Sequence, residues 1–363
     1  MKNNEVCIGI IGCGRIAGHH CSSIQEVDGV KLSSVCDLID EKAKNYGDEF
    51  NVPWFINYRE MLEKHPEIDT VVIATPSGMH FEHGMEILTR HKKNLIMEKP
   101  TFMRLDDLKI AYDEAEKIGL RIFPVFQNRY NKAVERVKKA IINDELGDIR
   151  IMSVRVRWCR PQRYYDLAPW RGLFSHDGGA ITNQGIHHVD LLRYFGGEVD
   201  KVNSTMRTLG AKIEVEDTVV AILTYDSGAV GNVEVTTSAR PDDYEASISV
   251  VGSKGLAQIG GIAVNELQTF TPDPTICSAY SEDFSGDIGI YGNGHKKIYK
   301  DIASSLLGDK PFPLGRQECL NTIKLLNAFY RSDEECGWVK VATAKQSDRL
   351  GRPNEELSEL YRL

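Results

Sequence analysis

The start of the chain constrains its fold more than any other segment. Residues 6–12, VCIGIIG, form a nearly continuous apolar run that leads into the G-x-G-x-x-A sequence of residues 12–17. Such a run is typical of a parallel strand that is buried on both faces. A helix is expected from about Arg15 to Val27, and the next strand, 30–36, precedes Asp37 directly. This order predicts the first strand–helix–strand unit of a doubly wound α/β domain.

The same turn predicts a dinucleotide site. Gly12 permits a tight turn, and Gly14 lets main-chain N–H groups approach a pyrophosphate. The helix that begins near Arg15 and Ile16 directs its positive end toward the phosphates. Asp37 stands where an acid accepts hydrogen bonds from the ribose hydroxyls and repels a 2′-phosphate, so we expect NAD rather than NADP. The alternative is a glycine turn that binds another nucleotide, or none.

Strands and helices continue to alternate up to about residue 130. Strands are expected at 69–76, 94–100 and 121–127, with helices at 80–91 and 105–119 between them. The turns after such strands meet at the carboxyl edge of the sheet, where open α/β sheets bind ligands. Arg129 is expected near a crevice at that edge as a substrate holder. The residues expected there beside the cofactor are Thr75, Pro76, His80, Glu98, Lys99 and Gln127. His80 is expected to open its helix rather than to contact substrate.

The second half of the chain is rich in strands. After a connecting helix at 131–147, strands are expected at 149–158, 201–209, 217–226, 230–239 and 245–253. Hairpin residues such as DSG at 226–228 indicate antiparallel neighbours. Helices near 295–308 and 316–331 are expected to pack back onto the body.

The predicted fold class is therefore α/β with two domains. Residues 1–128 are expected to form an NAD-binding Rossmann domain. Residues 129–363 are expected to form a substrate-binding and oligomerisation α/β domain with a large, mostly antiparallel, open-faced sheet. The few helices available can cover only one face of that sheet. The other face is expected to pack against a second subunit in a homodimer or homotetramer.

Composition and charge exclude several classes of protein. At 363 residues the chain is too long for one ordinary core, and no apolar run reaches the length of about 18 residues that spans a bilayer. The net charge of −8 argues against a nucleic-acid binder. The polar start leads directly into the first expected strand, so no signal peptide is expected. The 8 cysteines are scattered without a CxxC pair, so we expect reduced thiols, no structural metal and a cytoplasmic location.

Lys99 is a candidate catalytic residue. A lysine that ends a buried strand beside a proline has little structural reason to be there. In a partly desolvated crevice beside a cationic nicotinamide, its pKa is expected to fall, so that it orients or deprotonates a hydroxyl. The alternative is a solvated lysine at a strand end.

Residues 177–192, DGGAITNQGIHHVDLL, crowd together groups that handle protons. If 181–195 is helical, Asn183 and His187 share one face by their i, i+4 spacing. A neutral imidazole suits the proton acceptor that alcohol oxidation needs, which makes His187 the second catalytic candidate and Asn183 a substrate holder. A metal site built from His187, His188 and Asp190 is disfavoured because adjacent histidines on a helix diverge. Asp190 either orients an imidazole or stabilises its own helix, and the sequence leaves both open.

A third cluster lies at 155–171, RVRWCRPQRYYDLAPWR, where arginines alternate with aromatic residues. Guanidinium groups match diphosphate or carboxylate oxygens, and aromatic planes can cover a base or a sugar face. The residues expected near substrate are Arg160, Arg163, Tyr164, Tyr165 and Arg171. The alternative is that the arginines face solvent or a partner subunit.

Five motifs together resemble the Gfo/Idh/MocA oxidoreductase family, which includes glucose–fructose oxidoreductase and inositol dehydrogenase. They are GIIGCGRIAGHH at 9–20, ATPSGMH at 74–80, EKP at 98–100, QNRYN at 127–131 and GGAITNQGIHHVDLL at 178–192. The resemblance implies a Rossmann domain, a second domain on a large open sheet, and hydride transfer between NAD(P) and a sugar-like hydroxyl.

Position 183 departs from the commoner family pattern, which has aspartate there. The TN-x-G-x-H sequence at 182–187 resembles the subgroup of UDP-sugar 3-dehydrogenases, which oxidise the C3 hydroxyl of UDP-N-acetylglucosamine or its uronate. The resemblance implies that Lys99 and His187 share the proton of a secondary hydroxyl, although which one is the base stays open. The alternatives are an inositol or free-monosaccharide dehydrogenase and a non-catalytic dinucleotide-binding regulator.

Overall fold

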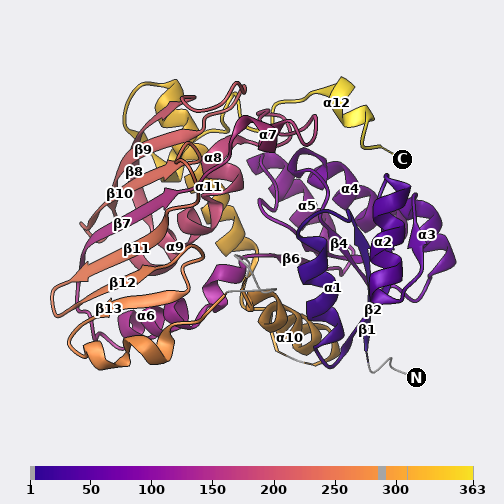
Figure 1. The fold of residues 1–363 in the computed structure, drawn as a ribbon, viewed down its shortest axis with the longest axis horizontal. Helices are drawn as coiled ribbons and strands as arrows, with labels where there is room; N and C mark the ends of the chain where they lie inside the picture. Colours follow the sequence, from indigo (N-terminus) through magenta and orange to yellow (C-terminus); the bar gives the residue numbers. More distant parts are fainter. Residues whose placement is uncertain (1–4, 285–291, 309, 363) are drawn as a thin grey trace. The chain divides into compact units, whose positions relative to one another are not determined.

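Six parallel strands form the sheet of the first unit of the chain. The computed structural model describes residues 5–284, 292–308 and 310–362, and the chain divides into two compact units. The strand order β3-β2-β1-β4-β5-β6 is that of a dinucleotide-binding doubly wound fold. The strands are β1 (Val6–Ile11), β2 (Val30–Cys36), β3 (Trp54–Phe55), β4 (Thr70–Ile73), β5 (Asn94–Met97) and β6 (Ile122–Pro124) (Figure 1).

Helices and helical turns alternate with these strands, as the sequence predicts. The predicted helix 80–91 divides into α4 and a π-helical turn, η2, that follows it directly. The helical segments of this part of the chain are α1 (Ala17–Gln25), α2 (Asp40–Phe50), α3 (Tyr58–Lys64), η1 (Ser77–Met79), α4 (His80–Glu86), η2 (Ile87–His91) and α5 (Leu105–Lys117).

Two later segments also belong to the first unit, which consists of Met1–Val125, His295–Leu320 and Pro353–Leu363. On α10 (Gly294–Leu307), Ser305 accepts a hydrogen bond of 2.6 Å at Oγ from the guanidinium of Arg121. After α12 (Glu355–Glu359), the guanidinium of Arg362 pairs with Glu82 at 2.6 Å.

This unit is therefore discontinuous in sequence, unlike the predicted division at 128/129. The later segments carry ion pairs and hydrogen bonds made with the first 125 residues, and local sequence patterns do not reveal such partners.

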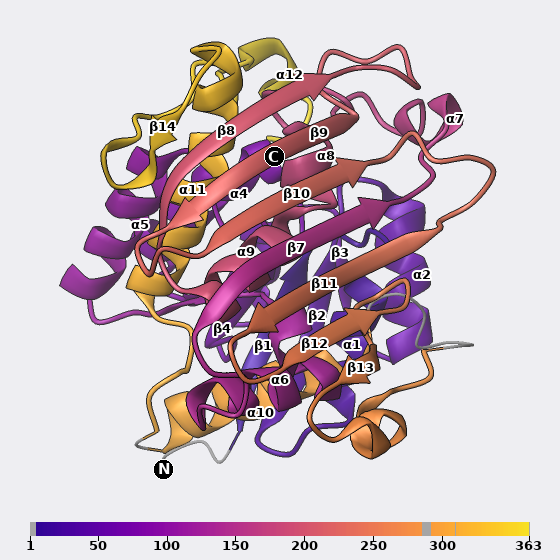
Figure 2. The same ribbon diagram turned by 90° about the vertical axis from the view of Figure 1, so that its left-hand side faces the viewer.

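Eight strands form the sheet of the second unit, Phe126–Gly294 with Asn321–Arg352. Their order is β13-β12-β11-β7-β10-β9-β8-β14, and the pairs are antiparallel except β7 with β10. The strands are β7 (Ile149–Arg157), β8 (Val199–Arg207), β9 (Thr218–Tyr225), β10 (Val230–Thr236), β11 (Glu245–Gly252), β12 (Leu256–Gly260), β13 (Glu266–Phe270) and β14 (Val339–Lys340) (Figure 2).

One face of this sheet is covered by helices of the same unit. Buried and more exposed residues alternate along β9, so its buried side chains form one face and its exposed ones the other. Contacts join α9 to β7 and β11, α8 to β9 and β10, and α6 to β12. The helical segments of this unit are η3 (Gln127–Tyr130), α6 (Lys132–Ile142), α7 (Gln162–Tyr165), α8 (Gly179–Asn183), α9 (Ile186–Gly196), η4 (Pro274–Tyr280), η6 (Val341–Thr343) and most of α11 (Arg316–Glu334).

The continuous helix considered for 181–195 is not present, and two shorter helices take its place. Helix α8 ends at Asn183 and α9 begins at Ile186. Between them, the N–H of Gly185 bonds to the carbonyl of Ala180 at 2.8 Å, and a Cβ at Gly185 would lie 3.0 Å from the Cα of Ile181. This close approach needs glycine and interrupts the helix, so Asn183 and His187 do not share one helical face.

Candidate active site

The glycine-rich turn of the first unit has a shape that only glycine permits. Gly12 has φ +98°, and a Cβ on it would lie 2.6 Å from the carbonyl oxygen of Ala74. A Cβ on Gly14 would meet no atom within 4 Å, so the space beside the turn is open. Helix α1 begins three residues later, at Ala17. An open space at the start of a helix fits the pyrophosphate of a dinucleotide.

Asp37, directly after β2, ties that strand to the glycine-rich turn. Its Oδ2 accepts a hydrogen bond of 2.8 Å from the N–H of Cys13, and its Oδ1 accepts one of 2.9 Å from the N–H of Ile39. Each carboxylate oxygen has a second lone pair, so Asp37 can still accept hydrogen bonds from ribose hydroxyls. Arg15 is exposed and Ile16 half-buried beside the turn.

The ends of β4 and β5 are joined by His80, the first residue of α4. Its Nδ1 lies 2.9 Å from the carbonyl oxygen of Pro100, and its Nε2 lies 3.1 Å from that of Thr75. Burial lowers the pKa of His80. The neutral ring donates to one of these carbonyls at a time, because both partners only accept. His80 therefore holds the main chain on which Thr75, Pro76 and Lys99 stand.

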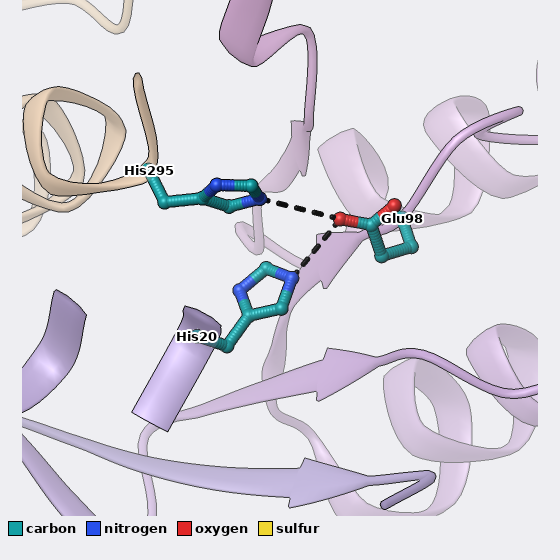
Figure 3. A group of neighbouring side chains, drawn as sticks. All are labelled: His20, Glu98 and His295. Carbon is teal, nitrogen blue, oxygen red and sulfur yellow. Dashed lines mark hydrogen bonds and ion pairs between the residues drawn. The ribbon is translucent and has the colours of Figure 1, made fainter. Parts of the chain in front are cut away.

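Lys99 lies two residues beyond β5 and is half-buried. Its main-chain N–H donates to Oε2 of Glu98 at 3.1 Å. Glu98 is buried, and its other oxygen contacts two histidines that the sequence did not single out, His20 and His295 (Figure 3). The signal that could have indicated them is weak: an HH pair in the first helix and a histidine at the start of a late one.

In the second unit, His187 lies at the start of α9 and is 7% exposed. Its Nε2 lies 3.1 Å from Nε2 of Gln127. The amide group donates, so the imidazole accepts at Nε2 and, when neutral, carries its proton on Nδ1. His188 is also buried, and burial lowers its pKa to about 4, so its ring stays neutral near pH 7.

Asn183, the last residue of α8, donates through its amide to Oδ1 of Asp177. Asp177 also accepts a hydrogen bond of 2.7 Å from the N–H of Gly172 at Oδ2. The orientation of the Asn183 amide is thus set by a buried carboxylate. Asparagine donates and accepts hydrogen bonds but takes up no proton, which suits a residue that holds a hydroxyl.

Arg129 is bound to Asp190 by two hydrogen bonds of 2.6 Å, and both residues are buried. Thr322 donates to the same carboxylate at 2.9 Å, and the ring of Tyr194 lies 4.4 Å from the guanidinium carbon. Asp190 therefore pairs with arginine rather than orienting an imidazole. Arg129 and Gln127 belong to the second unit, which begins at Phe126.

The arginine-rich segment packs guanidinium groups on aromatic rings. Arg160 donates to Asp243 at 2.7 Å and lies 5.6 Å from the ring centroid of Tyr164. The guanidinium carbon of Arg171 lies 4.3 Å from the centroid of the same ring. Tyr165 is buried, with its hydroxyl 3.0 Å from Oγ1 of Thr237, whereas Arg163 is exposed.

Arg171 and Tyr165 also line a cavity of about 660 Å³ in the second unit. Nε of Arg171 is buried and, among the described residues, has no hydrogen-bond partner. The other charged residues of the lining are Lys212, Glu214 and Asp166, and Arg171 is the one whose buried nitrogen lacks a partner among the described residues. The cavity can therefore receive an anionic group, which would satisfy the guanidinium.

Comparison with family models assigns both halves of the chain. Residues 6–126 match the model described as "Oxidoreductase family, NAD-binding Rossmann fold", and residues 134–258 match the model described as "GFO/IDH/MocA C-terminal domain". The chain belongs to the Gfo/Idh/MocA oxidoreductase family.

Solved structures and curated relatives agree with this assignment. The chain is similar to the WlbA dehydrogenase of Bordetella pertussis, solved with NADH and UDP-GlcNAcA, at 34% identity and TM-score 0.87, over 94% of this chain and 99% of that one. The WlbA dehydrogenase of Chromobacterium violaceum, in complex with the same two molecules, gives 32% identity and TM-score 0.85, over 94% and 97%.

Among curated proteins, the chain is similar to glucose-6-phosphate 3-dehydrogenase of Bacillus subtilis, at 30% identity over 68% of this chain and 72% of the relative. It is also similar to myo-inositol 2-dehydrogenase of Thermotoga maritima, at 26% identity over 68% and 73%.

The class of the protein follows from these findings. It is an NAD-dependent oxidoreductase of a family of sugar and polyol dehydrogenases, and its first unit is the NAD-binding domain. Among the helices of the described residues, none combines the length and the apolarity needed to cross a bilayer.

Proposed function

We propose that this protein oxidises the C3 hydroxyl of a nucleotide-linked amino sugar or of its uronate, with NAD⁺ as the hydride acceptor. The observation that carries the proposal is the likeness, over 94% of the chain, to two dehydrogenases solved with UDP-GlcNAcA. The TN-x-G-x-H sequence at 182–187, with asparagine at position 183, supports the same substrate class.

In this proposal the residues of the chain handle the proton of the hydroxyl, while bound NAD⁺ takes the hydride from the same carbon. Lys99 and His187 are the proton-handling residues. The half-buried position of Lys99 and the 7% exposure of His187 keep both groups largely away from bulk water. Asn183, held by Asp177, orients the hydroxyl by a hydrogen bond.

Binding of a diphosphate or a uronate carboxylate is assigned to the cationic side chains of the second unit. Arg171 brings a buried guanidinium nitrogen to the cavity that Lys212 also lines. Other residues of the segment 155–171 are also proposed to contact the substrate, namely Arg160, Arg163, Tyr164 and Tyr165. Arg129, expected from the sequence to hold substrate, is bound to Asp190 on α9, so we assign it a positioning role for the helix that carries His187 instead.

The relatives by sequence favour a second candidate, oxidation of an inositol or of an unlinked sugar. The specific observation is the 30% identity to glucose-6-phosphate 3-dehydrogenase of Bacillus subtilis. The free thiol state of all the cysteines is compatible with a cytoplasmic reaction in either case.

One assay separates the two candidates. Formation of NADH is followed by absorbance with UDP-GlcNAcA, UDP-GlcNAc, glucose 6-phosphate, inositols and free hexoses, each with NAD⁺ and then with NADP⁺. We expect the highest kcat/KM with a UDP-linked sugar and NAD⁺. Turnover of inositol or glucose 6-phosphate without turnover of UDP-sugars would establish the second candidate instead.

A further inference from the structure

Three buried side chains from distant parts of the sequence meet beside Lys99. His20 comes from α1, Glu98 follows β5, and His295 is the second residue of α10 (Figure 3). Oε1 of Glu98 lies 3.0 Å from Nε2 of His20 and 3.7 Å from Nε2 of His295. None of the three residues is more than 5% exposed.

Tyr299 on α10 holds the imidazole of His20 on the side away from Glu98. Its hydroxyl lies 2.7 Å from Nδ1 of His20, and burial raises the pKa of Tyr299 well above its ordinary value. The neutral phenol can therefore donate to Nδ1, which leaves the proton of His20 on Nε2, where it bonds to Glu98. A chain of hydrogen bonds thus runs from Tyr299 through His20 to the carboxylate.

Glu98 is ionised in this setting. Burial opposes its ionisation, but the hydrogen bond from His20 and the imidazole of His295, 3.7 Å away, outweigh that effect and hold the pKa of Glu98 well below its usual range. A buried carboxylate that is held by donors is a rigid, charged support.

The second oxygen of Glu98 contacts the main chain of Lys99. Oε2 of Glu98 accepts the N–H of Lys99 at 3.1 Å, and the next carbonyl, that of Pro100, lies 2.9 Å from Nδ1 of His80. The backbone on both sides of the Lys99 side chain is therefore held by buried groups. Since the position of a catalytic amine follows from its main chain, these contacts restrict where its nitrogen can reach.

The donor atoms of His20, Glu98 and His295 all lie within 4.8 Å of one another, so a metal site is the competing interpretation. Hydrogen bonding accounts better for the geometry. Both oxygens of Glu98 already accept an N–H, and both ring nitrogens of His20 already have partners within 3.0 Å. A bound dication would also stand close to a lysine, whose charge it would repel.

We propose that Glu98 is the positioning residue for Lys99, and that His20 and His295 hold it in place from α1 and α10. The inference rests on the proposed function, because it gives Lys99 the proton-handling role. A displaced Lys99 slows the chemical step and leaves the binding of NAD⁺ and sugar largely intact.

The first test needs no substrate. The acylation rate of each lysine by acetic anhydride is measured by mass spectrometry in the full-length wild-type chain and in Glu98→Gln. Weakening of the charged support lets the main chain of Lys99 move, so the acylation rate of Lys99 is expected to change by about threefold or more, while exposed Lys109 keeps its rate. The matched control is Glu67→Gln, which removes the charge from a His–Glu pair of 2.8 Å with His65 elsewhere in the same unit. Equal rates for Lys99 in all three proteins would overturn the proposal.

The second test is kinetic and uses the sugar that the substrate panel selects. Glu98→Gln and His295→Asn are expected to lower kcat by about 10- to 100-fold and to change KM for NAD⁺ by less than about threefold. Glu67→Gln is expected to match the wild type. If circular dichroism shows that Glu98→Gln has lost folded protein, His295→Asn, which leaves the carboxylate in place, is the deciding variant, and a wild-type kcat in that variant contradicts the inference.

The outcomes keep the two proposals apart. If the wild-type enzyme turns over no sugar of the panel, or Lys99→Ala keeps full turnover, the proposed function fails, while the acylation rates still test the support of Lys99. If Lys99→Ala is inactive and both Glu98→Gln and His295→Asn keep wild-type kcat, only the inference fails. About one zinc or iron ion per chain in elemental analysis, lost on His295→Asn, would replace it with a metal site.

Discussion

At the scale of single residues, the candidate site is built from polar side chains that neighbours hold in place. Asp177 orients Asn183, Gln127 contacts His187, and Asp190 binds Arg129 with two hydrogen bonds of 2.6 Å. Ordering these groups during folding removes the cost of ordering them when substrate binds. In the proposed function, Asn183 and His187 contact the reactants, and Asp177 and Gln127 fix these two side chains.

Lys99→Ala and His187→Ala are each expected to lower kcat by about 100-fold or more, because each removes a group that handles the proton of the hydroxyl. NAD⁺ binding, measured by quenching of protein fluorescence, is expected to persist in both variants. The control is Lys109→Ala on α5, where the exposed lysine pairs only with Asp106 at 3.3 Å among the described residues. Undiminished turnover in both alanine variants would refute the assigned chemistry.

Glu216 provides a prediction about stability and pH. Burial raises its pKa to about 8, against which hydrogen bonds from Tyr330 and from the N–H of Ile181 act only partly. The folded protein therefore binds a proton that the unfolded chain releases above about pH 4.5, so this contribution to stability is full at low pH and decreases up to about pH 8.

Glu216→Gln, which is neutral at every pH, is expected to lose this pH dependence. Urea unfolding at pH 5, 6, 7 and 8 should show the variant gaining up to a few kcal/mol relative to wild type across that range, on the order set by the shift. The exposed Glu356→Gln on α12 serves as the control. A constant difference between Glu216→Gln and wild type at all four values would contradict the buried, protonated carboxyl.

At the scale of elements, long periodic segments were predictable and breaks were not. The apolar run 6–12 and the alternating strands of the second half correspond to β1 and to β7–β11. The two-residue strands β3 and β14 leave no periodicity to detect. The interruption between α8 and α9 depends on Gly185 approaching Ile181, which is a packing contact rather than a helical signal.

The glycine-rich turn gives a prediction with an internal control. Gly12→Ala is expected to destabilise the fold by about 2 kcal/mol or more, because φ of +98° is unfavourable for alanine and its Cβ would meet the carbonyl of Ala74. Gly14→Ala is expected to leave stability within about 1 kcal/mol, because its Cβ meets nothing. It should nevertheless weaken NAD⁺ binding about tenfold or more, by filling the space that the pyrophosphate needs.

Calorimetric titration with NAD⁺ and thermal unfolding measure the two effects separately. Gly119→Ala isolates the conformational cost alone, since Gly119 has φ +74° and open space around it. Tight NAD⁺ binding by Gly14→Ala would show that the coenzyme does not approach this turn.

At the scale of the whole molecule, one face of the second sheet carries no helix of its own unit among the residues that the structure describes (Figure 2). Val220 and Ile222, on β9, are each 56% exposed on that face, and Arg157 pairs there with Glu234 and Glu245. Exposed apolar residues beside ion pairs are typical of a surface that contacts another chain. We therefore expect a homodimer or homotetramer formed through this face.

The double variant Val220→Lys/Ile222→Lys is expected to dissociate the oligomer, because it buries two unpaired charges at the contact. Size-exclusion chromatography with light scattering measures the mass. Ile110→Lys on α5 is the matched control, since Ile110 is 49% exposed in the other unit. A wild-type mass near 40.7 kDa, that of one chain, would exclude the expected assembly.

The sequence by itself determined the fold class, the coenzyme and the candidates Lys99, Asn183 and His187, because these depend on local periodicity and on short motifs whose chemistry is carried by neighbouring residues. Only the tertiary structure decided which groups support them. In the structure, residues 295–320 and 353–363 belong to the first unit. His20 and His295 contact Glu98, and Arg129 pairs with Asp190. Such partners lie many residues apart, and packing rather than local pattern selects them, so no reading of adjacent residues could identify them.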